Sequence, residues 1–207
     1  MVTRERKEQL KDENIKKSRR QDNKQHCQKI LEGIGKFDNT TAERAIWELL
    51  QNARDLSNHA HVEITLDEDR FIFSHNGKPF DYDTLTSLIK QVSSEEKEDP
   101  NAAGQFGTGF MTTHKFSRKI QINGCMKIDE KEYVEINNFS LDRTDNEIQK
   151  MIDKMADQLG YVDDLYDKPT TSTPRAETSF IYELDDAHFP AAEQGVTAAF
   201  CLMPYVM

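Results

Sequence analysis

Residues 40–57, with the sequence TTAERAIWELLQNARDLS, constrain the fold of this chain most strongly. Apolar side chains recur there at spacings of three and four residues, which predicts an amphipathic helix with one buried face. Thr40, followed three residues later by Glu43, has the form of a capping box, so we expect the helix to begin at Thr40. The members of the apolar stripe are Ala42, Ala45, Ile46, Leu49, Ala53 and Leu56.

A second, polar stripe runs along the same helix. At about 100° per residue, Glu48, Asn52 and Asp55 fall on one line about a quarter turn from the apolar face. One interpretation is a solvent-facing side with mixed polar residues. The other is a site for a hydrated divalent metal and a polarised water, because Mg²⁺ takes few protein oxygens and keeps its waters and phosphates. The helix alone leaves both interpretations open.

The composition predicts one folded domain with an appended arm. At 207 residues and 36% hydrophobic, the chain can bury one core but is short for two full domains. Residues 1–36 hold 11 Lys and Arg against 6 Asp and Glu, a balance of +5, and the net charge of −10 therefore leaves −15 on the remainder. The acidic charge of the body argues against nucleic-acid binding, and the basic arm is the only part whose charge is compatible with it.

The cysteines and the ends of the sequence predict a cytoplasmic location. Cys27, Cys125 and Cys201 are odd in number and far apart, and no Cys or His spacing suggests a zinc site, so we expect reduced thiols. The N-terminus is charged and lacks the apolar segment of a signal peptide. No apolar run reaches the length of a membrane span, so no membrane partner is expected.

The elements outside the central helix are predicted from periodicity and turn residues. The arm is expected to be helical, folded back on the body or reaching to a second copy, with disorder of its first twenty residues as the alternative. Asp81 is expected to cap the helix that follows a hairpin, and Thr144 to cap a later helix whose apolar face belongs to the core. Strands are expected at 61–66, 70–74, 119–122, 133–137 and 177–184, with Gly124 between the third and the fourth.

A glycine-rich stretch follows a polar segment at 93–101 that we expect to be a mobile loop. It reads Gly104-Gln105-Phe106-Gly107-Thr108-Gly109-Phe110. Glycines at this spacing let backbone N–H groups approach an anion, and a helix starting near Phe110 would add a favourable dipole. The stretch is not a P-loop, because no Gly-Lys-Ser/Thr follows, and its spacing is not that of a dinucleotide fold.

Taken in order, these motifs resemble one known family. The chain has Glu48-x-x-x-Asn52-x-x-Asp55 on a helix, a strand ending in Asn76-Gly77, the glycine-rich stretch, and a late strand with Thr178. This order is similar to the GHKL ATPase superfamily, which joins gyrase-type topoisomerases, large heat-shock chaperones, histidine kinases and mismatch-repair ATPases. The segments ELLQNARD and GQFGTGF are most similar to the heat-shock chaperone and sacsin-like branch.

The resemblance covers residues 40–185 and implies an α+β fold. This Bergerat, or histidine kinase-like ATPase, fold is a two-layer α/β sandwich, with a mixed, mostly antiparallel sheet covered by helices on one face. The domain organisation expected is a charged helical arm at 1–36, an ATP-binding domain at 37–186, and at 187–207 the start of a following, truncated segment.

The resemblance also implies roles for individual residues. Glu48 would be the general base that polarises the attacking water, and Asn52 would ligate the Mg²⁺ that bridges the phosphates of ATP. Residues 93–103 would form a lid, and Thr178 would lie near the adenine with an ordered water. The nucleotide contacts implied are Asn52, Asp55, His75, Asn76, Gly77, Gly104, Gln105, Phe106, Gly107, Thr108, Gly109, Phe110 and Thr178.

One position departs from the family. Where the family has the aspartate of Asp-x-Gly-x-Gly, this chain has His75-Asn76-Gly77-Lys78-Pro79. That aspartate accepts a hydrogen bond from the adenine amino group. A neutral imidazole nitrogen can also accept one bond, so His75 is expected to face the base and accept it, or else to point elsewhere and leave base recognition to water. Pro79 replaces the second glycine and stiffens the turn.

The leading expectation is therefore slow, Mg²⁺-dependent ATP hydrolysis that drives conformational change in a larger protein. The alternative is a nucleotide-binding switch that does not hydrolyse ATP and has altered base recognition. A histidine kinase is disfavoured, because no dimerisation helix with a phosphoacceptor histidine precedes Glu48. The partners expected are ATP, a second copy bound through the arm, and further domains of a longer chain.

Overall fold

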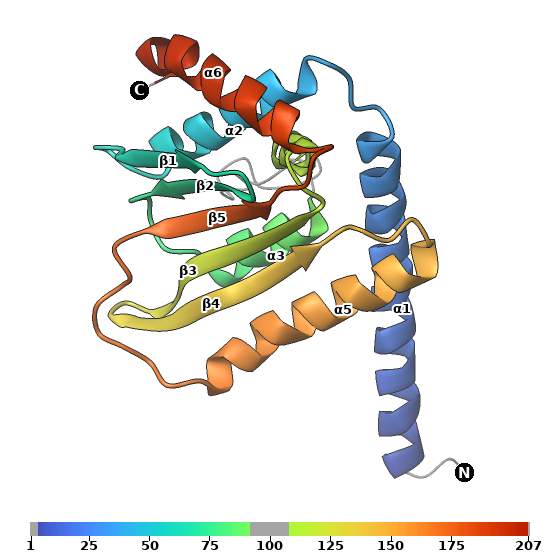
Figure 1. Ribbon diagram of the computed structural model, residues 1–207. Helices are drawn as coiled ribbons and strands as arrows, with labels where there is room; N and C mark the ends of the chain where they lie inside the picture. The colour runs from blue at the N-terminus through green and yellow to red at the C-terminus, as the bar shows by residue number, and fades with distance from the viewer. Residues whose placement is uncertain (1–3, 92–107, 207) are drawn as a thin grey trace.

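A single five-stranded antiparallel sheet lies at the centre of the computed structural model, which describes residues 4–91 and 108–206 (Figure 1). The spatial order of the strands is β1-β2-β5-β3-β4, so the last strand in sequence lies in the middle. All four pairings between neighbouring strands are antiparallel, and an isolated bridge between Phe80 and Met126 is parallel. The strands are β1 (Val62–Leu66), β2 (Arg70–His75), β3 (Lys119–Asp129), β4 (Glu132–Asp142) and β5 (Thr178–Glu183).

Helices cover one face of this sheet, as the alternation of its residues requires. Phe71 lies opposite Tyr182 and Phe73 opposite Phe180, and all four side chains are buried. Ile72 and Ile181, which point to the other face, stay partly exposed. The expected α+β two-layer sandwich is confirmed. The helices are α1 (Arg4–Ile34), α2 (Thr41–Asp55), α3 (Tyr82–Lys90), α4 (Thr108–Met111), α5 (Ile148–Asp164) and α6 (Phe189–Val206), with 3₁₀ turns η2 (Thr112–Lys115) and η3 (Leu165–Asp167).

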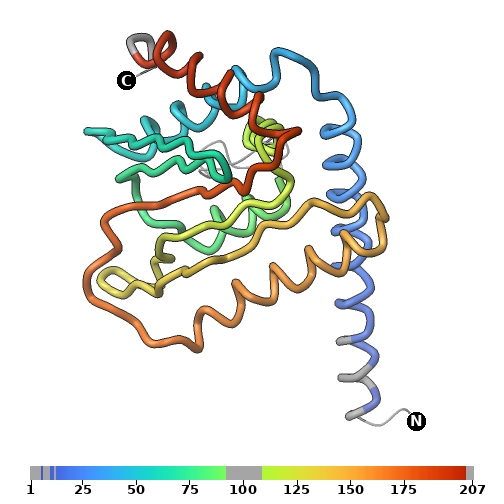
Figure 2. The backbone as a smooth tube through the Cα atoms, viewed as in Figure 1, coloured from blue at the N-terminus to red at the C-terminus, as the bar shows by residue number. Residues whose placement is uncertain are grey.

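The arm forms the long helix α1, which is only partly attached to the body. Its C-terminal half packs mainly against α5, and Asn23, Cys27 and Ile30 are buried in that contact region. Its N-terminal end extends beyond the rest of the molecule (Figure 2). Within the described residues, no helix has both the length and the apolar character needed to cross a membrane.

Helix α2 starts where predicted, with Thr40 as its N-cap residue, but the expected capping bond is absent, and α5 starts later than predicted. Thr40 makes no capping bond from its side chain; instead an Asp38 carboxylate oxygen accepts from the Thr40 N–H and hydroxyl and from the Thr41 hydroxyl, each at 2.9 Å. Thr144 likewise bonds to Asp142, at 2.8 and 2.7 Å, and α5 starts only at Ile148. In both places the threonine hydroxyl donates to the carboxylate of an aspartate two residues earlier. The cap at Asp81 is confirmed, because its side chain accepts from the Thr84 N–H at 2.7 Å.

Gly124 was expected between two strands, but it lies inside β3. Strands β3 and β4 are each 11 residues long, and Gly124 faces Ile136 beside a register shift. A Cβ at position 124 would lie 3.1 Å from the Thr178 hydroxyl. The glycine therefore provides space beside a neighbouring strand and does not mark a turn.

The C-terminal stretch forms α6, which packs against α2 more extensively than any other helix does. Ala192 and Ala199 are buried, and a Cβ at Gly195 would lie 2.8 Å from the Phe116 ring. Small residues thus let α6 approach the body closely. Residues 189–206 therefore rest on the same body that carries α2.

Candidate functional site

Helix α2 presents its polar stripe at three different depths. Its apolar face is buried as predicted, and beside it Asn52 is also buried, with an exposed fraction of 6%. Glu48, one turn earlier, is half-buried. Asp55 is exposed and pairs with its neighbour Arg54 at 2.7 Å. The structure therefore groups Glu48 and Asn52, whereas the Asp55 carboxylate lies in solvent.

Glu48 packs directly on the start of the short helix α4. A Cβ added to Gly109 would overlap the Glu48 carboxylate, so a side chain at position 109 would displace this carboxylate from its place. Burial raises the pKa of Glu48, and the positive charge of Arg44, one turn earlier on α2, lowers it in part. A carboxylate with a raised pKa and access to water is suited to accept a proton from a bound water.

A cavity of about 570 Å³ opens beside Glu48 and Gly109. It lies between the C-terminal half of α1, the first half of α2, and the ends of α3 and α4. Its wall carries more positive than negative side chains, although the chain as a whole is acidic. The basic members are His26, Lys29, Lys36, Arg44 and Lys90, and the acidic members are Glu32 and Glu48.

His75, the last residue of β2, lies on the helix-covered face of the sheet, with an exposed fraction of 3%. Its ring stacks at 6.0 Å from the Phe180 ring. Nδ1 accepts a hydrogen bond from the Gly77 backbone N–H at 3.0 Å, and Nε2 has no partner among the described residues. Burial lowers the pKa of His75 to about 4, so the ring is neutral at pH 7.

These contacts give the imidazole the opposite polarity from the one expected. A backbone N–H can only donate, so Nδ1 of His75 carries the lone pair and Nε2 carries the single proton of the neutral ring. The nitrogen left without a partner is therefore a donor. The expectation that His75 offers an acceptor to the base is wrong for this geometry.

The turn after His75 is fixed to the end of α2. The Asn76 side chain accepts from the His61 N–H at 2.8 Å and donates to the His59 carbonyl at 3.0 Å, so its amide is used within the protein. The Lys78 N–H donates to the Leu56 carbonyl at 3.1 Å. A Cβ at Gly77 would lie 2.7 Å from the Leu56 Cβ, so glycine permits this contact.

Thr178 and Phe110 complete what the structure describes of the predicted site. Thr178 is buried directly opposite His75 in the β2–β5 pairing, so the two residues implied at the base are brought together. The Phe110 ring is fully buried, 5.3 Å from the Phe180 ring. Thr108 begins α4. The lid at 93–103 and the residues Gly104, Gln105, Phe106 and Gly107 lie outside the described residues, and their roles stay predictions.

The sequence interpretation missed the basic wall of the cavity. Arg44 could have been found from the sequence, because it precedes Glu48 by four residues and so lies on the same helix face. Lys29, Lys36 and Lys90 come from other segments and meet only in the folded chain. Within the described residues there is no group of three or more His, Cys, Asp or Glu that can hold a metal.

Comparison with known proteins gives a weak similarity to a chaperone protein. No family model matches the chain. The chaperone protein HtpG from two strains of Campylobacter jejuni subsp. jejuni is 28% identical over 105 residues, which covers 42% of this chain and 17% of HtpG. This supports the resemblance only at the level of the superfamily, since the match spans less than a fifth of the length of HtpG.

Proposed function

We propose that this chain is a Mg²⁺-dependent, ATP-binding module that hydrolyses ATP slowly and drives conformational change in a larger protein. The observation that carries the proposal is the geometry of α2. One helix presents a half-buried Glu48 to a cavity with a basic wall and, one turn later, a buried Asn52 toward the layer between helices and sheet. The similarity to HtpG, a chaperone, supports the same family.

The two ends of α2 suit the two ends of a nucleotide. Arg44, Lys36 and Lys90 give the cavity beside Glu48 the charge that a polyphosphate requires. At the other end, His75 and Thr178 are adjacent, buried polar side chains under the helices. Four residues along a helix span about 6 Å, so Glu48 and Asn52 are separated by roughly the length of one or two phosphate groups.

Within this proposal each residue has a distinct task. Glu48 takes the proton of the attacking water, because burial has raised its pKa toward the working pH. Asn52 supplies one oxygen to the metal, which would neutralise phosphate charge when bound. The basic side chains around the cavity hold the terminal phosphate against Glu48 and stabilise the charge that develops there.

Arg44 favours the alternative, a nucleotide-binding switch without hydrolysis. Its charge lowers the pKa of Glu48 and so weakens the carboxylate as a base. In that case Glu48 is an ion-pair partner that holds Arg44 toward the phosphates. The two candidates differ in turnover and not in nucleotide affinity.

Replacing Glu48 by Gln decides between them. If Glu48 is the base, turnover by the full-length protein falls by about 10²–10⁴-fold while ATP affinity changes by less than about threefold. The measurements are phosphate release and calorimetry, and Glu63→Gln, an exposed carboxylate on β1, is the matched control. Equal turnover in the variant and the parent contradicts the role of Glu48, and no turnover in either supports the switch.

We also propose that the arm mediates dimerisation and that further domains of a longer protein act with this module. A basic segment on an otherwise acidic chain is suited to bind a second copy.

A further inference from the structure

We propose that His75 recognises the nucleotide base as a hydrogen-bond donor, through Nε2–H, to an acceptor on the Watson–Crick edge of a purine. The inference rests on the proposed function, because it concerns the base end of the same site. It reverses the polarity of the carboxylate that the family has at this position. The amino group of adenine is then not the group that the protein reads.

The polarity follows from a bond whose direction is certain. The Gly77 backbone N–H lies 3.0 Å from Nδ1 of His75 and has no way to accept. Nδ1 must therefore be unprotonated, and the neutral ring carries its proton on Nε2. Protonation of the ring would place two N–H groups against each other, so the same contact disfavours the imidazolium.

The proton on Nε2 is buried and lacks an acceptor among the described residues. Around the ring lie Phe73 at 6.2 Å and Phe180 at 6.0 Å between ring centres, which offer no carbonyl or carboxylate from their side chains. A buried donor without a partner costs free energy, because it has lost its hydrogen bond to water. A ligand that brings an acceptor restores this hydrogen bond and so binds more tightly. Such a group is a basis for selectivity toward a ligand.

Asn52 indicates that this unpartnered donor belongs to the site. Its amide nitrogen is also buried and without a partner among the described residues. Asn52 lies one turn before Leu56, whose Cβ is against Gly77, the residue that bonds to His75. Two unpartnered buried polar groups thus come from α2 and from the end of β2 where these two elements meet.

Purines differ in the acceptors they offer to such a donor. Adenine offers N1, and a 6-oxopurine offers O6, whereas the 6-amino group of adenine can only donate to the protein. A donor at His75 is therefore compatible with both ATP and ITP. Analogues show which group of adenine, N1 or the 6-amino group, the protein recognises. Purine riboside triphosphate lacks the amino group but keeps N1, and 1-deaza-ATP keeps the amino group but lacks N1.

The experiment measures the affinity of the protein for these four triphosphates by calorimetry. We expect ATP, ITP and purine riboside triphosphate to bind within about threefold of one another, and 1-deaza-ATP to bind at least about tenfold more weakly. In His75→Asp the order is expected to change, so that ATP binds at least about tenfold more tightly than ITP. His59→Asp, the same replacement at an exposed histidine, is the control.

The outcomes separate this inference from the proposed function. A parent that binds ATP but binds purine riboside triphosphate at least tenfold more weakly overturns the donor role and leaves nucleotide binding standing. Binding of none of the four overturns both. Long-range ¹H–¹⁵N NMR of the nucleotide-free protein reads the tautomer directly, and a proton on Nδ1 overturns the inference whatever the protein binds.

Discussion

At the scale of single residues, Asn52 and His75 are buried polar side chains that each have one atom without a partner among the described residues. Such atoms oppose folding, and proteins keep few of them. Position 52 was predicted from its spacing to Glu48, and position 75 from its place before Asn76-Gly77. The polarity of His75 was not predictable, because it depends on a backbone N–H two residues away that only the folded turn brings to Nδ1.

Replacing Asn52 by Ala tests the metal ligand. We expect the effect of Mg²⁺ on ATP affinity to be lost, because the metal loses its direct protein oxygen, while Asn52→Asp retains a Mg²⁺ effect. Because the amide nitrogen has no partner to lose, the free energy of unfolding should change by only about 1 kcal/mol. Calorimetry with and without Mg²⁺ gives the result, and an unchanged Mg²⁺ effect in Asn52→Ala places the metal elsewhere.

His75 also predicts how stability depends on pH. Its folded-state pKa of about 4 lies below the ordinary value of 6.5, so between these pH values the unfolded chain binds a proton that the folded protein does not. The contribution of His75 to the free energy of unfolding is therefore fully present above pH 6.5. It falls by about 1.4 kcal/mol per pH unit as the pH drops from 6.5 toward 4.

We expect His75→Gln to reduce that slope by about one proton, measured by urea unfolding across the same range. His114, whose pKa burial lowers to about 3, continues to contribute in both proteins. His59→Gln, at an exposed side chain, serves as the control. A slope that His75→Gln leaves unchanged shows that the imidazole is not held neutral.

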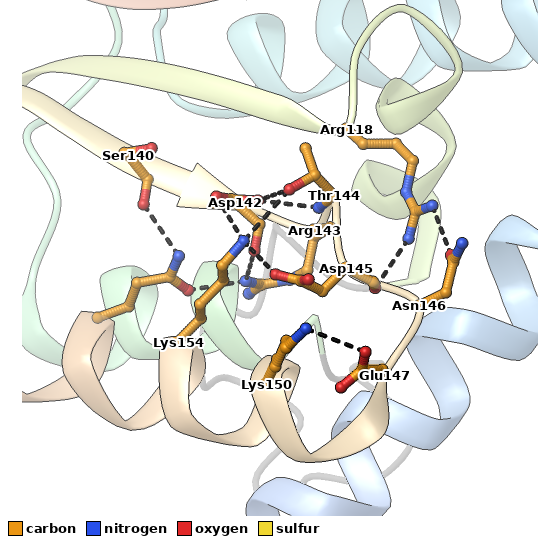
Figure 3. A network of polar contacts seen from close by, with 11 residues as sticks. Arg118, Ser140, Asp142, Arg143, Thr144, Asp145, Asn146, Glu147, Lys150 and Lys154 are labelled. Atoms are coloured by element: carbon orange, nitrogen blue, oxygen red, sulfur yellow. Dashed lines mark hydrogen bonds and ion pairs between the residues drawn. The ribbon is translucent and has the colours of Figure 1, made fainter.

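At the scale of elements, Arg143 joins three parts of the fold that the sequence separates. It is fully buried after β4 and donates to the Gln158 side chain of α5 at 2.7 Å and to the Ile89 carbonyl of α3 at 2.6 Å. Gln158 in turn donates to the Ser140 carbonyl at 2.9 Å. Figure 3 shows Arg143 and Ser140 of this network beside the ion pair of Lys154 with Asp142, whose atoms lie 2.7 Å apart.

We expect Arg143→Met to lower the free energy of unfolding by about 3 kcal/mol, because it leaves buried carbonyl and amide oxygens without a donor. Urea unfolding of the variant measures the loss. Arg175→Met, at an exposed arginine that bonds to Asn137, should change stability by less than about 0.5 kcal/mol. Equal stability of the two variants contradicts the structural role of Arg143.

The elements themselves were largely predictable, and their limits were not. Periodicity gave the hairpin, the apolar faces of α2 and α5, and the strand containing Thr178, because burial of one face requires these patterns. The start of α2 at Thr40 was right, whereas the capping bond of Thr40 and the start of α5 at Thr144 were wrong; both threonine hydroxyls donate instead to a nearby carboxylate, Asp38 or Asp142. Gly124 was wrongly placed between two strands, because its role inside β3 depends on Thr178, which lies far away in sequence.

At the scale of the whole molecule, charge is divided between α1 and the body. The first 36 residues carry +5 and the remainder −15. The helical state of the arm was predicted, but its path was not, because its attachment depends on side chains of its C-terminal half, such as Asn23, Cys27 and Ile30, that meet distant parts of the chain. The preceding part exposes Leu10 and Ile15 to 38% and 42%, and an isolated helix of this length is marginally stable in water.

The proposed dimer follows from that division, because the basic end of α1 in one copy complements the acidic body of another. We expect the protein to sediment as a dimer at low salt and to dissociate as salt rises, since exposed charges are screened over about 10 Å at 0.1 M. Deleting residues 1–21 should yield a monomer of unchanged thermal stability, because the buried residues of α1 remain. Leu10→Glu with Ile15→Glu, which keeps the length of the helix, should weaken the dimer as well. Sedimentation gives the answer, and a parent that stays monomeric at every concentration, or a truncated chain that still dimerises, contradicts the role of the arm.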